Sequence, residues 1–538
     1  MMMRSMRIAL LMVIVLRAVP AAAQAWSPDA GEGRYRNPII FADFSDPDVV
    51  RVGGDFYMTS SSFGSFPALP ILHSRDLVHW TIVNHAIPRF PDAAFDIPQH
   101  GNGVWAPSLR HHDGWFWIFY GDPDRGIYRV RTRDVRGAWE PPVLVHAAKG
   151  WIDPAPLWDD DGNAYLVHAF ARSRSGIKHV LHVNRMSPDG TRLLDAGTQV
   201  FMDSVRHPTM EGPKFYKRNG WYYIFTPAGG VPTGWQTVLR SRNVYGPYED
   251  RIVLAQGATA INGPHQGGWV TTESGEDWFI HFQDRGAYGR IVHLQPMAWK
   301  DDWPVMGTDA DGDGTGEPVA EWRMPDAGGS HPPVVPQTTD EFDGARLGLQ
   351  WQWYANPRDA WHSLADGRLR LHAQPVPDSA VNLWRVPNLL AQMLPAPAFD
   401  ATTRLSFAGL REGEKAGLVM MGLDYAYLAV RRTASGTELV YAVATDAHQG
   451  GRERETRVPV RGDAIHLRVT VAEGAVSRFW HSADGVRWEP IGAPFAAREG
   501  RWIGARVGVF ALAPSGAAET GSADFDFFRI APPSNAVP

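Results

Sequence analysis

Five residues whose side chains could move protons or offer a flat aromatic surface to a ligand recur at matching places along the first 300 residues. Each lies a short, nearly constant distance before a glycine in a turn-forming run, and they are Asp46, Trp105, Asp153, Glu211 and His265. Three carboxylates that occupy equivalent places in a repeat are expected to converge on one cavity. Like charges brought together raise at least one pKa, so such a site obtains an acid and a base at the same pH.

Enzymatic hydrolysis of a glycosidic bond usually needs two carboxyl groups, one on either side of the bond. One protonates the leaving oxygen, and the other activates water or attacks the anomeric carbon. Aromatic side chains offer flat apolar surfaces to sugar rings, and the candidates near the repeated positions are Phe63, Trp105, Trp151 and Trp235. The alternative for each acid alone is a turn-capping role, and for each aromatic it is packing between sheets.

The elements that must position these residues are hairpins. In each copy an apolar strand, a glycine turn and an aromatic-rich strand follow the candidate residue, and the turn glycines are Gly54, Gly114, Gly162, Gly220 and Gly275. Asp113-Gly114, Asp161-Gly162 and Asn219-Gly220 are expected to supply positive-φ turns. The glycines are 60, 48, 58 and 55 residues apart. This period predicts a five-bladed β-propeller; five unrelated hairpins in a large sandwich are the alternative.

The rest of the chain predicts a second all-β domain. Residues 321–337 are rich in proline and glycine and are expected to be a linker after a propeller over 26–320. Beyond them, short segments alternate between apolar and polar residues, as at 368–372, 465–471 and 505–512. Period-two alternation predicts an antiparallel β-sandwich of jelly-roll type over 338–534.

The N-terminal residues predict export. Arg4 and Arg7 precede an apolar stretch at 8–16, and small residues follow at 21–25. This order is typical of a secretory signal peptide, here residues 1–25, with an uncleaved anchor as the alternative. The remaining chain has no apolar run of membrane-spanning length, so we expect a periplasmic or secreted protein without a membrane partner.

Composition excludes several other functions. The formal net charge of −6 is too small to indicate a nucleic-acid partner. The absence of cysteine excludes disulfides, thiolate metal sites and cysteine nucleophiles. Nothing in the sequence indicates the oligomeric state.

Several short motifs, in order, resemble glycoside hydrolase family 43. They are Asn37-Pro-Ile-Ile, Asp46-Pro-Asp, Trp105-Ala-Pro-Ser, Ile152-Asp-Pro, Glu211-Gly-Pro and Trp299-Lys-Asp-Asp-Trp-Pro. The C-terminal half resembles the concanavalin-A-like sandwich of β-xylosidases in that family. The resemblance implies an inverting mechanism, in which Asp46 is the general base, Glu211 is the general acid, and Asp153 raises the pKa of Glu211 and holds it in place. Inversion needs room for water, so the carboxyls of Asp46 and Glu211 are expected to lie roughly 6.5–9.5 Å apart.

The resemblance also implies the residues that contact the substrate. Phe63 and Trp105 match the aromatic walls around the cleaved sugar, and Arg290 matches a substrate-contacting arginine. His265 matches a central histidine that often faces a hydrated calcium ion at the propeller axis. Because calcium prefers oxygen ligands, contact through water and a simple structural hydrogen bond are both open for His265. No cofactor is expected for the chemistry itself.

Together these features predict an exo-acting, inverting glycosidase that releases terminal pentoses from plant hemicellulose or its oligosaccharides. β-D-Xylose is the favoured sugar, and an α-L-arabinofuranosidase using the same site is the alternative. Ala228 stands where some β-xylosidases of the family carry an acidic residue, which leaves the sugar open. A non-catalytic carbohydrate-binding protein is the alternative from another class, and a structural propeller that binds proteins ranks last.

Overall fold

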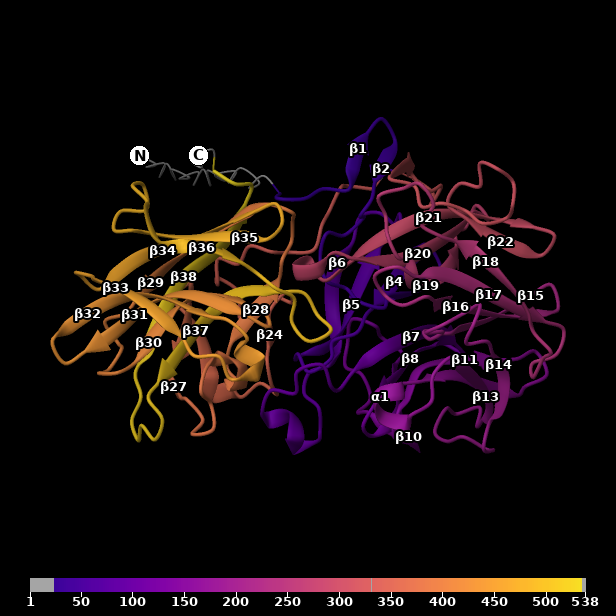
Figure 1. Ribbon diagram of the computed structural model, residues 1–538, viewed down its shortest axis with the longest axis horizontal. Coiled ribbons are helices and arrows are strands. Elements are labelled where there is room, and N and C mark those ends of the chain that lie inside the picture. Colours follow the sequence, from indigo (N-terminus) through magenta and orange to yellow (C-terminus); the bar gives the residue numbers. More distant parts are fainter. Residues whose placement is uncertain (1–23, 330, 535–538) are drawn as a thin grey trace, which may run out of the picture.

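A computed structural model describes residues 24–329 and 331–534. They form two domains side by side, the N-terminal one in indigo to magenta and the C-terminal one in orange to yellow (Figure 1). Both consist almost entirely of antiparallel strands, the pair of β27 with β37 being parallel, which confirms the all-β prediction. Within these residues helical structure is limited to single turns: α1 (Arg172–Ser175), η1 (Ala93–Asp96), η2 (Gly286–Tyr288), η3 (Asp359–Trp361), η4 (Leu383–Arg385) and η5 (Ala447–Gln449).

The N-terminal domain contains five four-stranded sheets in the part of the chain that the structure describes, each built from strands consecutive in sequence. The first two comprise β3 (Asp48–Val52), β4 (Asp55–Thr59), β5 (Ala68–Ser74), β6 (Thr81–Ile87), then β7 (Trp105–His112), β8 (Trp115–Asp122), β9 (Gly126–Thr132) and β10 (Val143–Ala147). The next two comprise β11 (Trp151–Trp158), β12 (Ala164–Phe170), β13 (Val180–Met186), β14 (Thr198–Met202), then β15 (Lys214–Arg218), β16 (Trp221–Ala228), β17 (Trp235–Ser241) and β18 (Glu249–Leu254). The fifth comprises β19 (His265–Thr271), β20 (Asp277–Asp284), β21 (Arg290–Lys300) and β22 (Trp303–Met306).

The predicted hairpins are present in all five sheets. The first two strands of each sheet pair across the predicted turns, as in His112 opposite Trp115 and Arg218 opposite Trp221. Asp113 and Asn219 adopt the positive φ expected of them. The third turn differs, because only Gly162 of Asp161-Gly162 has positive φ. There the loop is longer, and the Asp159 N–H donates to the Asn163 carbonyl.

The first strands of the sheets lie next to one another. β3 contacts β7 and β19, β7 contacts β11, and β11 contacts β15. Residues just before or at the start of these strands therefore face a common region, which is the placement that the candidate residues need. The closed five-bladed propeller stays a prediction.

A small sheet forms next to the predicted linker. β1 (Asp29–Gly31) pairs with β2 (Arg34–Arg36), and β2 pairs with β23 (Glu321–Arg323). The first residues of the segment predicted as a linker are thus a strand, because their backbone completes the edge of β2.

The C-terminal domain is the predicted β-sandwich. One sheet has the order β24 (Gln352–Trp353), β28 (Leu390–Met393), β37 (Arg506–Ala513), β30 (Lys415–Met421), β31 (Tyr425–Thr433), β32 (Gly436–Ala444) and β33 (Arg454–Pro459), with β27 (Gln374–Pro375) on β37. The facing sheet has the order β25 (His362–Ala365), β26 (Arg368–His372), β38 (Ser522–Ala531), β29 (Phe399–Ser406), β34 (Ala464–Ala472), β35 (Val476–Ser482) and β36 (Glu489–Ala496).

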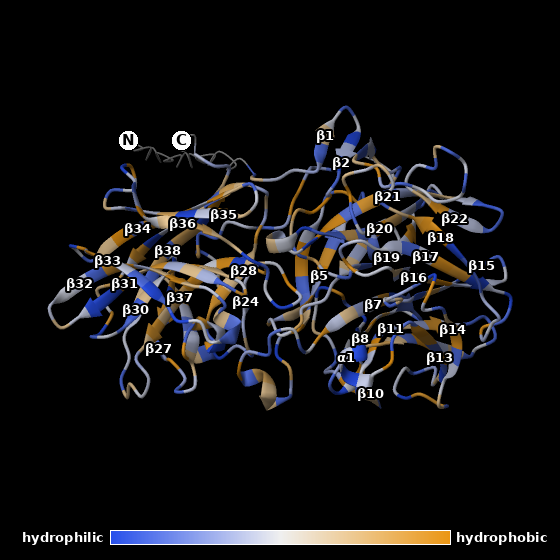
Figure 2. Ribbon diagram, in the orientation of Figure 1, coloured by the Kyte–Doolittle hydropathy of each residue, from blue (hydrophilic) through white to orange (hydrophobic). Residues whose placement is uncertain are grey.

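The two domains share a hydrophobic core at their interface. Phe41, Tyr288 and Ile291 of the N-terminal domain belong to the same buried cluster as the sandwich core. The Tyr288 hydroxyl donates to the Pro397 carbonyl at 2.6 Å. Hydrophobic residues gather in strands such as β5, β18 and β21, whereas peripheral loops are largely hydrophilic (Figure 2). Burial across the interface fixes the domains relative to each other.

Most of the predicted signal peptide, residues 1–23, lies outside the described residues. Among the helices that the structure describes, none is long and apolar enough to cross a membrane.

Candidate active site

A backbone irregularity recurs at the start of the first strand of every sheet in the N-terminal domain. One residue in each repeat, at or directly after the candidate residue, has a positive φ, and these residues are Asp46, Ala106, Asp153, Gly212 and Gln266. The strand register also shifts at three of these places, in β7, β11 and β19. Such bulges re-aim side chains, and they are frequent beside functional sites.

Asp46 is buried and fixed by two neighbours. The Ser61 hydroxyl donates to Oδ2 at 2.5 Å. Arg290 Nη1 lies 3.0 Å from Oδ1 and 3.2 Å from Oδ2. The Ala106 N–H in turn donates to Ser61 Oγ at 2.7 Å. Three different sheets therefore hold this carboxylate in one orientation.

Asp153 is joined to the backbone next to Glu211. The Gly212 N–H donates to Asp153 Oδ2 at 2.7 Å, and Asp153 is only 4% exposed. Burial raises the pKa of Asp153 well above its usual range, and the nearby charge of Glu211 adds to this. The contact supports the expectation that Asp153 holds Glu211 in place.

Glu211 is the most accessible of the three carboxyls, with a side chain 25% exposed. Its backbone is fixed by the Thr226 hydroxyl, which donates to the Glu211 carbonyl at 2.7 Å. Burial raises the pKa of Glu211 from 4.5 to about 7, and Asp46 adds to the rise while Lys178 and Arg290 oppose it. Burial, rather than the charge of Asp153, is thus the main cause. A carboxyl with this pKa can donate a proton near neutral pH.

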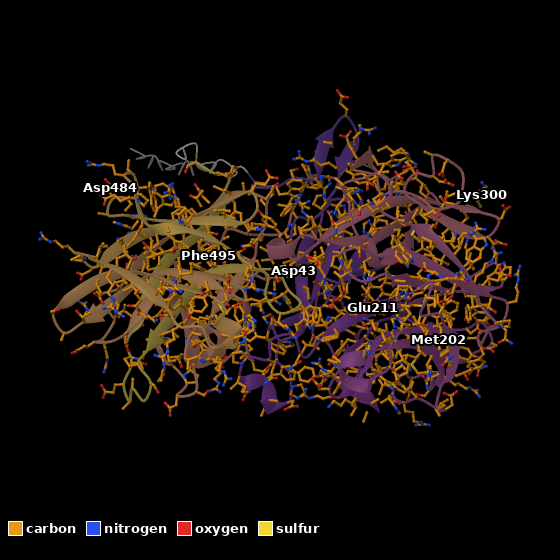
Figure 3. The ribbon with its side chains drawn as sticks, viewed as in Figure 1. Asp43, Met202, Glu211, Lys300, Asp484 and Phe495 are labelled. Carbon is orange, nitrogen blue, oxygen red and sulfur yellow. The ribbon has the colours of Figure 1, made fainter. Side chains whose placement is uncertain are left out.

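The three carboxyls line one cavity of about 110 Å³. Six of the nine candidate residues are among its walls, and Trp151, Trp235 and His265 are not. The six are Asp46, Phe63, Trp105, Asp153, Glu211 and Arg290. The rings of Phe63 and Trp105 meet edge to face with centroids 6.0 Å apart. Figure 3 labels Glu211 inside the N-terminal domain, in this view between Asp43 and Met202. The repeat therefore identified residues that the fold brings together, whereas the separation of the Asp46 and Glu211 carboxyls stays a prediction.

Trp502 is a wall residue that the sequence reasoning missed. It lies in the sandwich, on the loop between β36 and β37, and its ring meets Trp105 with centroids 6.2 Å apart. It lines both the carboxylate cavity and an adjoining hollow of about 580 Å³. Val231 and Arg290 also border both spaces. The second domain therefore contributes directly to the mouth of the cavity.

Ser61 was missed as well, although it contacts Asp46 directly. It belongs to the run Ser60-Ser61-Ser62 after β4, and this cluster of small hydroxyls was the available signal. Nothing around Trp502 in the sequence distinguishes it from other exposed tryptophans, so only the fold reveals its place.

His265, which is not among those walls, is completely buried beside Glu211. Its Nε2 lies 3.7 Å from Glu211 Oε1, and neither ring nitrogen has a hydrogen-bond partner. Burial lowers the pKa of His265 to about 3, so the ring is neutral at ordinary pH. Within the described residues, His265 belongs to no group of three metal-ligating side chains. The two unpaired ring nitrogens of His265 fit a contact with water.

Comparisons with known proteins identify both domains of the chain. Residues 35–304 match the model of the glycosyl hydrolases family 43, and residues 339–531 match the β-xylosidase C-terminal concanavalin-A-like domain. The chain is 41% identical over 493 residues to a putative β-xylosidase from Xylanibacter ruminicola, covering 91% of this chain and 88% of the relative.

Two further relatives extend the comparison. A non-reducing end α-L-arabinofuranosidase from Bacteroides ovatus is 29% identical over 544 residues, which cover 92% of this chain and 94% of the relative. The crystal structure of a xylan β-1,4-xylosidase from Bacillus halodurans superposes with a TM-score of 0.81 at 26% identity. That superposition covers 92% of this chain and 99% of the other. Both domains, in this order, are thus shared with these proteins.

Proposed function

The chain belongs to the glycosyl hydrolases of family 43, and from that premise we propose that it removes terminal β-D-xylose from hemicellulose-derived oligosaccharides. The observation that carries the proposal is a small cavity lined by three carboxyls and by Trp502 of the sandwich. A cavity of this size accepts the end of a chain rather than its middle, which favours exo cleavage. The 41% identical relative, a putative β-xylosidase, supports the choice of sugar.

In the proposed reaction Glu211 is the general acid. Its proton moves to the glycosidic oxygen as the bond to the anomeric carbon breaks, and its pKa of about 7 keeps it protonated in mildly acidic solution. Asp46 is the general base that takes a proton from the attacking water. Water enters from the face opposite the leaving group, so the anomeric configuration inverts.

The other residues hold these two groups and the sugar. Asp153 is the positioning residue for Glu211, since it accepts from the adjacent Gly212 N–H. Arg290 and Ser61 orient the base. Phe63 and Trp105 provide apolar surfaces for the cleaved sugar, because their rings border the carboxylate cavity.

We propose further that the five sheets are the blades of a propeller. The repeat of about 50 residues supports this, as do the contacts among the first strands β3, β7, β11 and β15, and the return of β19 to β3. In this arrangement the carboxyls lie at one end of the central axis.

A hydrated calcium ion at that axis is a separate proposal. The two unpaired nitrogens of His265 support a contact through water, and no step of the reaction depends on an ion there. Export also stays a proposal, supported by the basic, apolar and small-residue order of residues 4–25.

The test is hydrolysis of aryl β-D-xylopyranoside compared with aryl α-L-arabinofuranoside, with Glu211→Gln as the blank. We expect faster release from the xyloside, abolished in the variant. Preference for the arabinofuranoside would favour the alternative that the Bacteroides ovatus relative suggests. If ligands bind but neither these glycosides nor xylo-oligosaccharides are cleaved, the protein is a carbohydrate-binding protein instead.

A further inference from the structure

The carboxylate of Asp43 accepts hydrogen bonds from both domains. Its Oδ1 faces donors of the N-terminal domain, and its Oδ2 faces a donor of the sandwich. Oδ1 accepts from the Arg290 N–H at 2.8 Å and from the Ser45 hydroxyl at 2.9 Å. Oδ2 accepts from the N–H of Gly504, in the sandwich, at 2.8 Å. The residue is 4% exposed and lies where the two domains meet (Figure 3). A buried carboxylate is stable only with such partners, so all three contacts matter to its placement.

On the catalytic side, Asp43 fixes the backbone from which the side chain of Arg290 extends to Asp46. Gly289, directly before Arg290, has a φ of +73°, and a Cβ there would lie 2.4 Å from Asp43 Cγ. The turn before β21 is therefore built tightly against this carboxylate. Ser45, which also donates to Asp43, directly precedes Asp46.

On the sandwich side, Asp43 fixes the loop that carries Trp502. Gly504 follows Trp502 by two residues, and a Cβ on Gly504 would lie 2.7 Å from Gly289 N. The next residue, Ala505, donates its N–H to the Ala287 carbonyl at 2.7 Å. The loop and the turn before β21 are thus in direct backbone contact beside Asp43.

We propose that Asp43 is a positioning residue that sets the base-holding Arg290 and the wall residue Trp502 at a fixed distance from each other. The effect on catalysis rests on the function proposed above, whereas the link between the domains does not. Asp43 lies outside the cavity walls and acts through the two backbones that it joins. The sandwich thereby becomes part of the catalytic geometry rather than an appended support.

Three variants test the link. Asp43→Asn keeps the shape and one acceptor oxygen but places an amide against an N–H donor, so it must release one side. Asp43→Ala releases both. In Gly504→Ala the carboxylate is kept, but the new Cβ presses on the backbone of Tyr288 and Gly289, so the loop and the turn before Arg290 are disturbed together.

Two substrates report on the two sides. β-D-Xylosyl fluoride has a one-atom leaving group and reports on Asp46 and Arg290, whereas xylobiose must also fit beside Trp502. We expect Asp43→Ala to lower kcat on the fluoride about 10–100-fold, since small misplacements of catalytic groups have effects of this size. We expect Asp43→Asn to raise KM for xylobiose at least threefold with a smaller change in kcat on the fluoride. Oδ1 has two donors and keeps its oxygen, so the amide faces the single donor Gly504 and releases the sandwich side.

Acrylamide quenching of tryptophan fluorescence tests the link without turnover. The contribution of Trp502 is the difference between each variant and the same variant carrying Trp502→Phe. We expect this contribution to be quenched more strongly in Asp43→Ala and in Gly504→Ala than in the parent protein. This measurement stands even if the protein hydrolyses neither substrate, so failure of the proposed function and failure of the link are distinguishable.

Asp400→Asn is the matched control. Asp400 is also 4% exposed, and its two oxygens accept from Thr470 and from Ser534, but both partners lie within the sandwich. It is expected to alter thermal stability without changing the KM and kcat pattern or the quenching of Trp502. Wild-type kinetics and quenching in a folded Asp43→Ala protein would overturn the proposal, as would the same changes in Asp400→Asn.

Discussion

The rings of Trp105 and Trp502 meet edge to face, with centroids 6.2 Å apart and planes at 67°, although they belong to different domains. Trp105 begins β7, and Trp502 stands on a sandwich loop. Together they form a continuous wall at the mouth of the carboxylate cavity. The cavity is therefore completed by residues almost 400 positions apart in the chain.

Trp502→Ala should weaken recognition of the sugar on the leaving-group side. We expect kcat/KM for xylobiose to fall about tenfold, equivalent to about 1.4 kcal/mol, with a much smaller change for β-D-xylosyl fluoride. Trp488→Ala is the control, because Trp488 is a partly exposed sandwich tryptophan stacked on Arg468. Equal losses on both substrates would show that Trp502 acts on the chemistry and not on the leaving group.

Glu211→Gln should lower kcat on xylobiose about 10²–10⁴-fold while the protein stays folded, because the amide cannot protonate the leaving oxygen. The loss should be smaller with β-D-xylosyl fluoride, whose leaving group needs little protonation. Glu273→Gln provides the matched control, since Glu273 is 59% exposed and pairs only loosely with Arg51. Near-normal turnover of xylobiose by Glu211→Gln would remove Glu211 from the role of acid.

The repeat made the carboxylates of the site predictable from sequence. Asp113-Gly114 and Asn219-Gly220 fix hairpin turns, and their regular spacing places Asp46, Asp153 and Glu211 in equivalent positions. Local turn chemistry and periodicity are properties of short segments, so they can be read before folding. The separation of the chain into two β domains follows from the same kind of signal.

Other parts of the site depend on long-range contacts and could not be predicted. Trp502 and Asp43 gain their roles only when two domains pack together, and neither lies in a motif. The positive φ of Asp46 and of Asp153 could not be predicted from the sequence either, because residues with positive φ are usually glycines. Burial by surrounding sheets supports these strained residues, and no local sequence pattern reports it.

The product anomer should be inverted. The proposed mechanism has water attack opposite the leaving group while Glu211 donates its proton, so a β-xyloside should first yield α-xylose. Proton NMR during the first minutes of hydrolysis, before mutarotation, distinguishes the two anomers. Early appearance of the β-anomer would require a covalent intermediate and exclude Asp46 as a base acting through water.

Chelation with EDTA should leave the thermal unfolding temperature unchanged within about 1 °C. Buried cores in both domains hold the fold, and the group of metal-ligating side chains found in the described part of the chain, Asp309, Asp311 and Asp313, lies on a largely exposed turn. Differential scanning calorimetry before and after chelation and exhaustive dialysis measures this. A cooperative loss of stability that added calcium restores would show that an ion is structural.

The raised pKa of Glu211 predicts that both the activity and the stability of the parent protein fall as the pH rises. Activity needs the protonated acid, so kcat/KM should fall as pH rises through about 7, and the residual activity of Glu211→Gln should not show this fall.

The native protein binds the Glu211 proton more tightly than the unfolded chain does, so ionisation of Glu211 destabilises the native state progressively between pH 4.5 and about 7. Above pH 7 the cost is at most about 3 kcal/mol. The Glu211→Gln variant has no carboxylate at this position and does not carry this cost of ionisation. It should therefore unfold at a higher temperature than the parent at pH 8, and the two unfolding temperatures should differ little at pH 4. Equal unfolding temperatures at pH 8, measured by calorimetry at both pH values, would show that Glu211 is ionised without strain and cannot be the acid at neutral pH.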